Sequence, residues 1–140
     1  MVYDNNNVFA KILRGELPSF KIYEDDKTYA MMDIMPQTTG HLLVLTKEPA
    51  ATFFDLSEEG AKACIATAKK IAPVLMKVTG ADGLIVSQFN HECAGQTVFH
   101  VHYHLVPRYI GQTVDKHAHT PGNMEEIKAL AEKLAKELSA

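Results

Sequence analysis

A ten-residue segment, FHVHYHLVPR at residues 99–108, alternates two kinds of side chain. Its histidines are His100, His102 and His104, and its alternating apolar residues are Val101, Tyr103 and Leu105. Because successive side chains of a β-strand point to opposite faces, the histidines share one face, roughly 6.5–7 Å apart along the chain. The apolar residues take the other face, which we expect to be buried. The segment therefore predicts a core strand with one apolar face and one imidazole face.

Helix and strand signals surround this strand. The patterns predict a short helix within 8–18, strands at 20–26, 28–36 and 40–47, a long helix at 55–80, strands at 83–89 and 98–109, and a C-terminal helix at 122–140. In the long helix, Ser57 is expected at the N-cap and Gly80 just past the end, whereas Pro73 should kink the helix or break it in two. Strands that follow one another through short turns favour an antiparallel α+β sheet over a doubly wound one.

The length and composition indicate one soluble domain. The chain has 140 residues, and its 46% hydrophobic and 22% charged residues are ordinary for a globular protein that buries a core. Its formal net charge of −3 argues against a nucleic-acid partner or an anionic membrane, because either would usually require a basic face.

The cysteines and the N-terminal segment indicate a location. Cys64 and Cys93 form no CxxC pair, and two isolated thiols suit a reducing compartment. The opening MVYDNNNVF lacks the basic and apolar regions of a signal peptide. No apolar run reaches the roughly 18 residues that a membrane span needs. We expect a cytoplasmic protein with no membrane partner.

Three interpretations of the imidazole face remain open. The first is a solvated polar face, although Lys, Thr or Glu usually fill such faces. The second is a metal site, because three imidazoles can hold zinc with an open position for water. The third is a catalytic site, in which one imidazole attacks a substrate while others orient it, bind charge or carry protons.

The turn AGQT at 94–97 favours the catalytic interpretation. Ala94 and Gly95 let a ligand approach the backbone closely, and Gln96 and Thr97 supply hydrogen-bond donors beside that approach. Small residues, backbone N–H groups and a hydroxyl suit an anionic ligand such as phosphate. Imidazoles next to a phosphate suit nucleophilic attack on phosphorus through a phosphohistidine.

These residues resemble the signature of the histidine triad (HIT) family of nucleotide hydrolases and transferases. HVHYHLV at 100–106 matches the family's alternation of three histidines with apolar residues, within the longer block AGQTVFHVHYHLVPR. FAKILRGELPSFKIYEDD resembles the opening of the family, and MDIMPQTTGHLLVLTK resembles its second block. The resemblance covers roughly residues 7–110 and points to the Hint-like nucleoside phosphoramidase branch.

The resemblance implies an α+β, HIT-like fold: a five-stranded antiparallel sheet with a long helix and terminal helices, extended across a homodimer. Residues 1–140 would be a single HIT domain, with a core at about 7–110 and a C-terminal loop and helix at 111–140. The implied activity is hydrolysis of a phosphoramidate-type nucleoside 5′-monophosphoryl compound at its α-phosphorus, through a covalent nucleotidyl-histidine. The substrate would be a purine nucleotide, and the mechanism needs no cofactor and no metal.

The resemblance also implies a role for each of several residues. The implied catalytic residues are His102 as the nucleophile, His104 for phosphate contact and proton transfer, His100 as an orienting partner and His41 as a supporting fourth histidine. The implied substrate-binding residues are Asp33 for the ribose hydroxyls, Ile34 beside the base, Asn90, and Gln96, Thr97 and Val98 on the phosphate and leaving-group side. A carboxylate accepts two hydrogen bonds, so Asp33 suits a vicinal diol.

The sequence departs from many bacterial relatives near its N-terminus. Their Cys-x-x-Cys pair helps to hold a structural zinc, and the matching positions here are Asn7 and Ala10. We therefore expect no zinc at this position. His117 and His119 belong to a polar loop and are expected to be solvated.

Other functions fit the same residues. One is cleavage of dinucleoside polyphosphates, which stays within the family. Another is a nucleotide-binding regulatory module whose hydrolysis is incidental. A third is a metalloenzyme built on three histidines.

Overall fold

The computed structural model describes residues 1–113 and 120–139, and it confirms the predicted order of helices and strands. The elements are α1 (Val8–Leu13), β1 (Lys21–Glu24), β2 (Thr28–Met32), β3 (Leu42–Thr46), α2 (Glu58–Thr79), β4 (Gly83–Ser87), the short 3-10 helix η1 (Glu92–Ala94), β5 (His102–Arg108) and α3 (Met124–Ser139). The predicted loop with His117 and His119 lies outside the described residues.

In the described part of the chain, five strands form one antiparallel sheet in the order β1-β2-β3-β5-β4. β5 pairs with β3 on one side and with β4 on the other. The register places His102 opposite Leu45 and His104 opposite Leu43. The predicted α+β fold with a five-stranded antiparallel sheet is confirmed, and the histidine strand lies inside the sheet.

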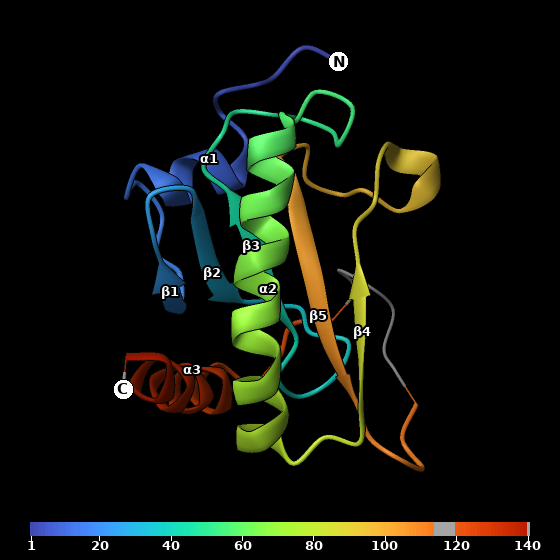
Figure 1. Cartoon of the computed structure of the whole chain (residues 1–140). Coiled ribbons are helices and arrows are strands. Elements are labelled where there is room, and N and C mark those ends of the chain that lie inside the picture. The colour runs from blue at the N-terminus through green and yellow to red at the C-terminus, as the bar shows by residue number, and fades with distance from the viewer. Residues whose placement is uncertain (114–119, 140) are drawn as a thin grey trace.

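The two faces of the sheet bury different side chains. Figure 1 shows α2 running across one face, and α3 packs near β1 on the same side. Val101, Tyr103 and Leu105 join the main apolar core on this face, as predicted. On the opposite face, Phe9 of α1 packs in a second apolar cluster that includes Leu43 of β3. The alternation of β5 therefore turns its histidines toward α1.

α2 begins and ends at the predicted residues. The Ser57 hydroxyl caps the helix by accepting a hydrogen bond from the Gly60 N–H (3.0 Å). Gly80 follows the helix with a φ of 70°, a left-handed conformation that suits glycine because it has no Cβ.

A kink or a break was predicted at Pro73. The break is wrong, because α2 is one continuous helix that includes this residue, and the kink stays a prediction. Pro73 is exposed, whereas Ile71 and Leu75 are buried against the sheet on either side of it. Packing of the apolar face therefore holds the helix together although proline lacks a backbone N–H.

β5 starts later than predicted. The predicted strand began at residue 98, but the regular ladder starts at His102. Before it, the Val101 N–H donates to the Ala50 carbonyl (2.9 Å), and the Val101 carbonyl accepts from the Thr46 N–H (3.3 Å). Val101 is thus held by the segment that leaves β3, and His100 lies ahead of the ladder.

Asn7 has a structural role at the start of α1. Its side-chain oxygen accepts from the Ala10 N–H (2.9 Å) and caps the helix, while its amide donates to the Asp4 carbonyl (2.7 Å). The expected lack of zinc at Asn7 and Ala10 stays a prediction.

Within the residues that the structure covers, no helix has the length and apolar character to cross a membrane. The cytoplasmic location stays a prediction.

Candidate active site

A cavity of about 210 Å³ opens beside the histidine face of β5. It lies among α1, the end of β2 with the turn that follows it, β3, and the loop before β5. The lining residues are Val8, Phe9, Ile12, Pro18, Ser19, Met31, Met32, Asp33, Ile34, Met35, Leu43, Thr97, Val98, His102 and His104. Most of these side chains are apolar, so the cavity combines an apolar pocket with a carboxylate and two imidazoles.

Most of the predicted site residues meet at this cavity. The predicted residues that line it are Asp33, Ile34, Thr97, Val98, His102 and His104. Two others stand behind the lining: His41 contacts His104, and His100 contacts His102.

Gln96 and Asn90 hold the loop that leads into β5. Gln96 is 2% exposed; its amide donates to the Ala51 carbonyl (2.7 Å) and its oxygen accepts from the His91 N–H (2.8 Å). The Asn90 oxygen accepts from the Phe53 N–H (2.6 Å). Neither side chain is among the described residues that line the cavity. The hydrogen bonds of these two side chains hold the loop in its conformation.

His102 has a fixed orientation. Its Nδ1–H donates to the backbone carbonyl of His100 (2.6 Å), because a carbonyl only accepts. A neutral imidazole carries one proton, so Nε2 keeps its lone pair. The edge of the Phe9 ring packs against the His102 ring, with centroids 4.8 Å apart and planes at 88°. The ring is therefore placed to present a nucleophilic nitrogen.

His100 is held at both ring nitrogens. Its Nε2–H donates to the Thr46 carbonyl (2.7 Å), so Nδ1 carries the lone pair and accepts from the Tyr3 hydroxyl (2.6 Å). Burial lowers the pKa of His100, and the hydrogen bond to Thr46 opposes that shift only in part. His100 is therefore neutral at neutral pH.

His41 and His104 form a directed chain that starts at a backbone amide. The Gln37 N–H donates to His41 Nδ1 (3.0 Å), which leaves the His41 proton on Nε2. That Nε2 lies 3.0 Å from His104 Nδ1, so His41 donates and His104 keeps its own proton on Nε2. The His104 and His102 ring centroids are 4.9 Å apart. His104 therefore offers an N–H donor on a ring that neighbours the His102 ring.

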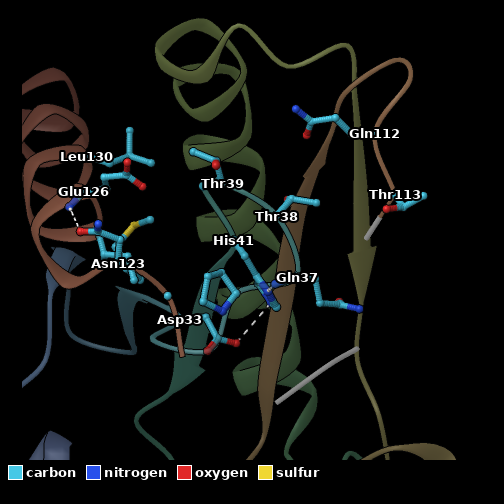
Figure 2. Close-up of a pocket in the computed structure, with 15 residues that line it drawn as sticks. Asp33, Gln37, Thr38, Thr39, His41, Gln112, Thr113, Asn123, Glu126 and Leu130 are labelled. Atoms are coloured by element: carbon cyan, nitrogen blue, oxygen red, sulfur yellow. Dashed lines mark hydrogen bonds and ion pairs between the residues drawn. The ribbon is translucent and has the colours of Figure 1, made fainter. Parts of the chain in front are cut away.

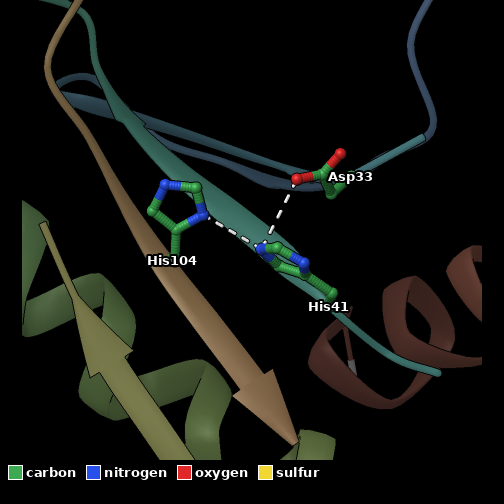
Figure 3. A group of neighbouring side chains, drawn as sticks. All are labelled: Asp33, His41 and His104. Atoms are coloured by element: carbon green, nitrogen blue, oxygen red, sulfur yellow. Dashed lines mark hydrogen bonds and ion pairs between the residues drawn. The ribbon is translucent and has the colours of Figure 1, made fainter. Parts of the chain in front are cut away.

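Asp33 touches the same chain (Figure 3). Its Oδ2 lies 3.4 Å from His41 Nε2, and its Oδ1 accepts from the Met35 N–H (2.8 Å). The ligand atoms of Asp33, His41 and His104 all lie within 4.8 Å of one another, a spacing that a metal ion can bridge.

The hydrogen bond from Gln37 opposes a metal in this cluster. A metal bound to His41 Nε2 would move the imidazole proton to Nδ1, where the Gln37 N–H already donates. Two donors would then face each other. The cluster therefore fits a proton on His41 Nε2, shared with His104 and Asp33, better than it fits a metal ion.

A second cavity, of about 300 Å³, shares Met32 and Asp33 with the first, and Figure 2 shows the residues that line it. Its polar lining includes Gln37 and Thr38 on the turn before β3, and Asn123 and Glu126 at the start of α3. Asp33 lines both cavities. Its carboxylate therefore lies where the two cavities meet.

Sequence reasoning missed the groups that fix the imidazoles. Tyr3 lies 97 positions from His100, and no local pattern links the two. Gln37 and Thr46 act through backbone atoms, which side-chain patterns do not mark. Only the turn PQTTG, whose Gly40 has a φ of 93°, hinted that Gln37 folds back onto His41.

Comparisons with known proteins identify similar sequences and a similar fold. The HIT domain matches residues 14–111. Protein hit of Bacillus subtilis is 36% identical over 138 residues, which cover 93% of this chain and 95% of that protein. Adenosine 5′-monophosphoramidase hnt1 of Schizosaccharomyces pombe is 35% identical over 134 residues, covering 94% and 97%. The crystal structure of a Hit-like protein from Bartonella henselae matches with a TM-score of 0.89 and 40% identity, covering 96% of this chain and 98% of that one.

The lowered pKa of His100 makes stability depend on pH. Above the ordinary histidine pKa of about 6.5, His100 is neutral in both the folded and the unfolded chain. As pH falls below that value, His100 binds a proton in the unfolded chain but not in the folded chain. The free energy of unfolding therefore decreases. Urea unfolding between pH 8 and pH 5 should show this loss, and His100→Gln should show a smaller one. Equal pH dependence in the two proteins would contradict the assignment.

Proposed function

Because the chain belongs to the HIT domain family, we propose that it is a hydrolase of nucleoside 5′-monophosphoryl compounds. The proposed substrate is a purine nucleoside phosphoramidate, cleaved at the α-phosphorus. One observation carries the proposal: His102 lines the cavity, and the hydrogen bond from its Nδ1–H to the His100 carbonyl puts the lone pair of the ring on Nε2. Its similarity to an adenosine 5′-monophosphoramidase over 94% of the chain supports the same substrate class.

The proposed reaction has two displacements at phosphorus. In the first, a bond forms between His102 Nε2 and phosphorus while the bond to the leaving amine breaks, and the amine takes up a proton. Attack puts positive charge on the His102 ring, which strengthens its Nδ1–H bond to the His100 carbonyl. In the second, water attacks phosphorus, the bond to Nε2 breaks, and the water releases a proton. The products are the nucleoside monophosphate, the amine and neutral His102.

His104 has a supporting role in this proposal. The chain from Gln37 through His41 keeps a proton on His104 Nε2, next to His102. An N–H held in that position donates to a phosphoryl oxygen as negative charge grows there, without first having to reorient. Thr97 lines the same cavity and is proposed to bind the phosphate with its hydroxyl.

The remaining cavity residues are proposed to bind the nucleoside. Asp33 would accept hydrogen bonds from the ribose hydroxyls, and Ile34 and Phe9 would flank the base. A purine suits the apolar lining because it is a large flat ring. Val98 would lie on the leaving-group side, and Gln96 and Asn90 would act by shaping the loop around it.

A substrate panel tests the proposal against its alternatives. With a chelator present, the wild-type protein should hydrolyse adenosine 5′-phosphoramidate faster than diadenosine triphosphate. His102→Ala should lose about 10³-fold or more in kcat, because both displacements need the imidazole. His91→Asn removes an exposed loop histidine that is not among the described residues lining the cavity, and should behave as wild type.

The other outcomes of this panel contradict the proposal in distinct ways. Faster cleavage of diadenosine triphosphate would indicate a dinucleoside polyphosphate hydrolase. Tight nucleotide binding without turnover would indicate a regulatory module. Loss of turnover in the chelator would indicate a metalloenzyme. Full activity of His102→Ala would contradict the assignment of His102 as the nucleophile.

A homodimer is part of the proposal. β4 is an edge strand of the sheet, and its Ile85 and Val86 are 41% and 52% exposed. Ile65 of α2 and Phe53 are also exposed and line one shallow surface depression. An unpaired edge with apolar neighbours favours pairing with a second chain.

Light scattering at micromolar concentration tests the dimer. The wild-type protein should have twice the mass of one chain, and Val86→Lys should shift it toward the monomer, because a charge would be buried in the interface. Val2→Lys, at an exposed apolar residue of the N-terminal segment, should leave the mass unchanged. A wild-type monomer would contradict the proposed dimer, and a dimer unaffected by Val86→Lys would contradict β4 as its interface.

A further inference from the structure

We propose that Tyr3 is a positioning residue for the nucleophile, acting through His100 from the N-terminal segment. The inference rests on the proposed function, since it concerns how His102 is held for attack. Tyr3 is not among the described residues that line the cavity. It acts on the reaction only through the residue whose carbonyl orients His102.

The contact between Tyr3 and His100 is directional. The Tyr3 oxygen lies 2.6 Å from His100 Nδ1, and the two rings pack with centroids 5.7 Å apart. Because His100 Nε2–H donates to the Thr46 carbonyl, Nδ1 can only accept, and the Tyr3 hydroxyl supplies the donor. His100 is 1% exposed, so water has little access to this nitrogen. Tyr3 therefore completes the hydrogen bonding of a buried imidazole.

The position of His100 matters because it lies outside the β5 ladder. Its ring is anchored at one end to the backbone of β3, through Thr46, and at the other end to Tyr3. Its carbonyl meanwhile accepts the proton of His102 Nδ1 at 2.6 Å. Anchoring the ring at both ends therefore restrains His100, and with it the carbonyl that sets the tautomer and direction of the nucleophile.

The segment that carries Tyr3 is itself held in place. The Asn7 amide donates to the Asp4 carbonyl (2.7 Å), and the Arg14 guanidinium donates to the Asn5 carbonyl (2.7 Å). Two positions beyond Asn7, the Phe9 ring packs edge-on against His102. One continuous stretch, from Tyr3 to Phe9, thus contacts His100 and His102.

The test is Tyr3→Phe, which removes the hydroxyl and keeps the ring against His100. On adenosine 5′-phosphoramidate we expect kcat to fall about ten-fold and KM to stay within about two-fold, because a misdirected nucleophile slows the chemistry without changing the cavity. The matched control is Tyr23→Phe, which removes a hydroxyl bonded to Asp25 at an exposed site and should leave both constants unchanged. Both variants should remain folded at the assay temperature by circular dichroism.

A spectroscopic signature separates positioning from a general structural role. In ¹⁵N NMR of the wild-type protein, His100 should carry its proton on Nε2, with Nδ1 at the position of a hydrogen-bonded acceptor. Tyr3→Phe should shift the Nδ1 resonance and leave the proton on Nε2. Tyr23→Phe should shift neither.

The outcomes distinguish failure of the role of Tyr3 from failure of the proposed function on which it rests. If the wild-type protein is active, His102→Ala is inactive and Tyr3→Phe matches the wild type, only the role of Tyr3 fails. A fall in kcat matched by an equal rise in KM would also overturn it. If wild-type turnover does not depend on His102, the proposed function itself fails.

Discussion

One hydrogen bond, from His102 Nδ1 to the backbone carbonyl of His100, decides which nitrogen of the central imidazole is available for chemistry. The fold provides this bond in a simple way. Period-two alternation in β5 places Tyr103 and Leu105 in the core and turns the histidines toward α1. α1 then closes over them with Phe9, so the ring has apolar contact on one side and a cavity beside it.

The same principle fixes the other imidazoles, because backbone groups assign their protons. The Thr46 carbonyl holds the proton of His100 on Nε2, and the Gln37 N–H keeps the proton of His41 on its Nε2. His41 Nε2–H then donates to His104 Nδ1, so the proton of His104 lies on its Nε2. Because hydrogen bonds to backbone groups fix which nitrogen carries each proton, the four rings form a preorganised set in which donors and acceptors are already in place. That order also disfavours a metal at Asp33, His41 and His104, although their ligand atoms are close enough to hold one.

Sequence reasoning predicted the strands, their antiparallel sheet and the buried side of β5, because these depend on local periodicity. It also placed Ser57 and Gly80 correctly, since helix ends have strong residue preferences. Of the kink or break predicted at Pro73, the break does not occur, because tertiary packing of α2 outweighs a local propensity. Tyr3 could not be found at all, because it contacts a residue 97 positions away. The roles of Gln96 and Asn90 rest on the resemblance alone, and their cited hydrogen bonds are with the backbone of the segment that follows β3.

The central claim is that His102 Nε2 attacks phosphorus and forms a covalent nucleotidyl intermediate. The most direct test is the stereochemical course at phosphorus, followed with a chiral nucleoside phosphorothioate analogue in isotopically labelled water with a chelator present. Each displacement inverts phosphorus, so attack by His102 followed by attack by water gives overall retention. The account predicts retention of configuration. Inversion would mean that water attacks the substrate directly, and it would contradict the assignment of His102 as the nucleophile.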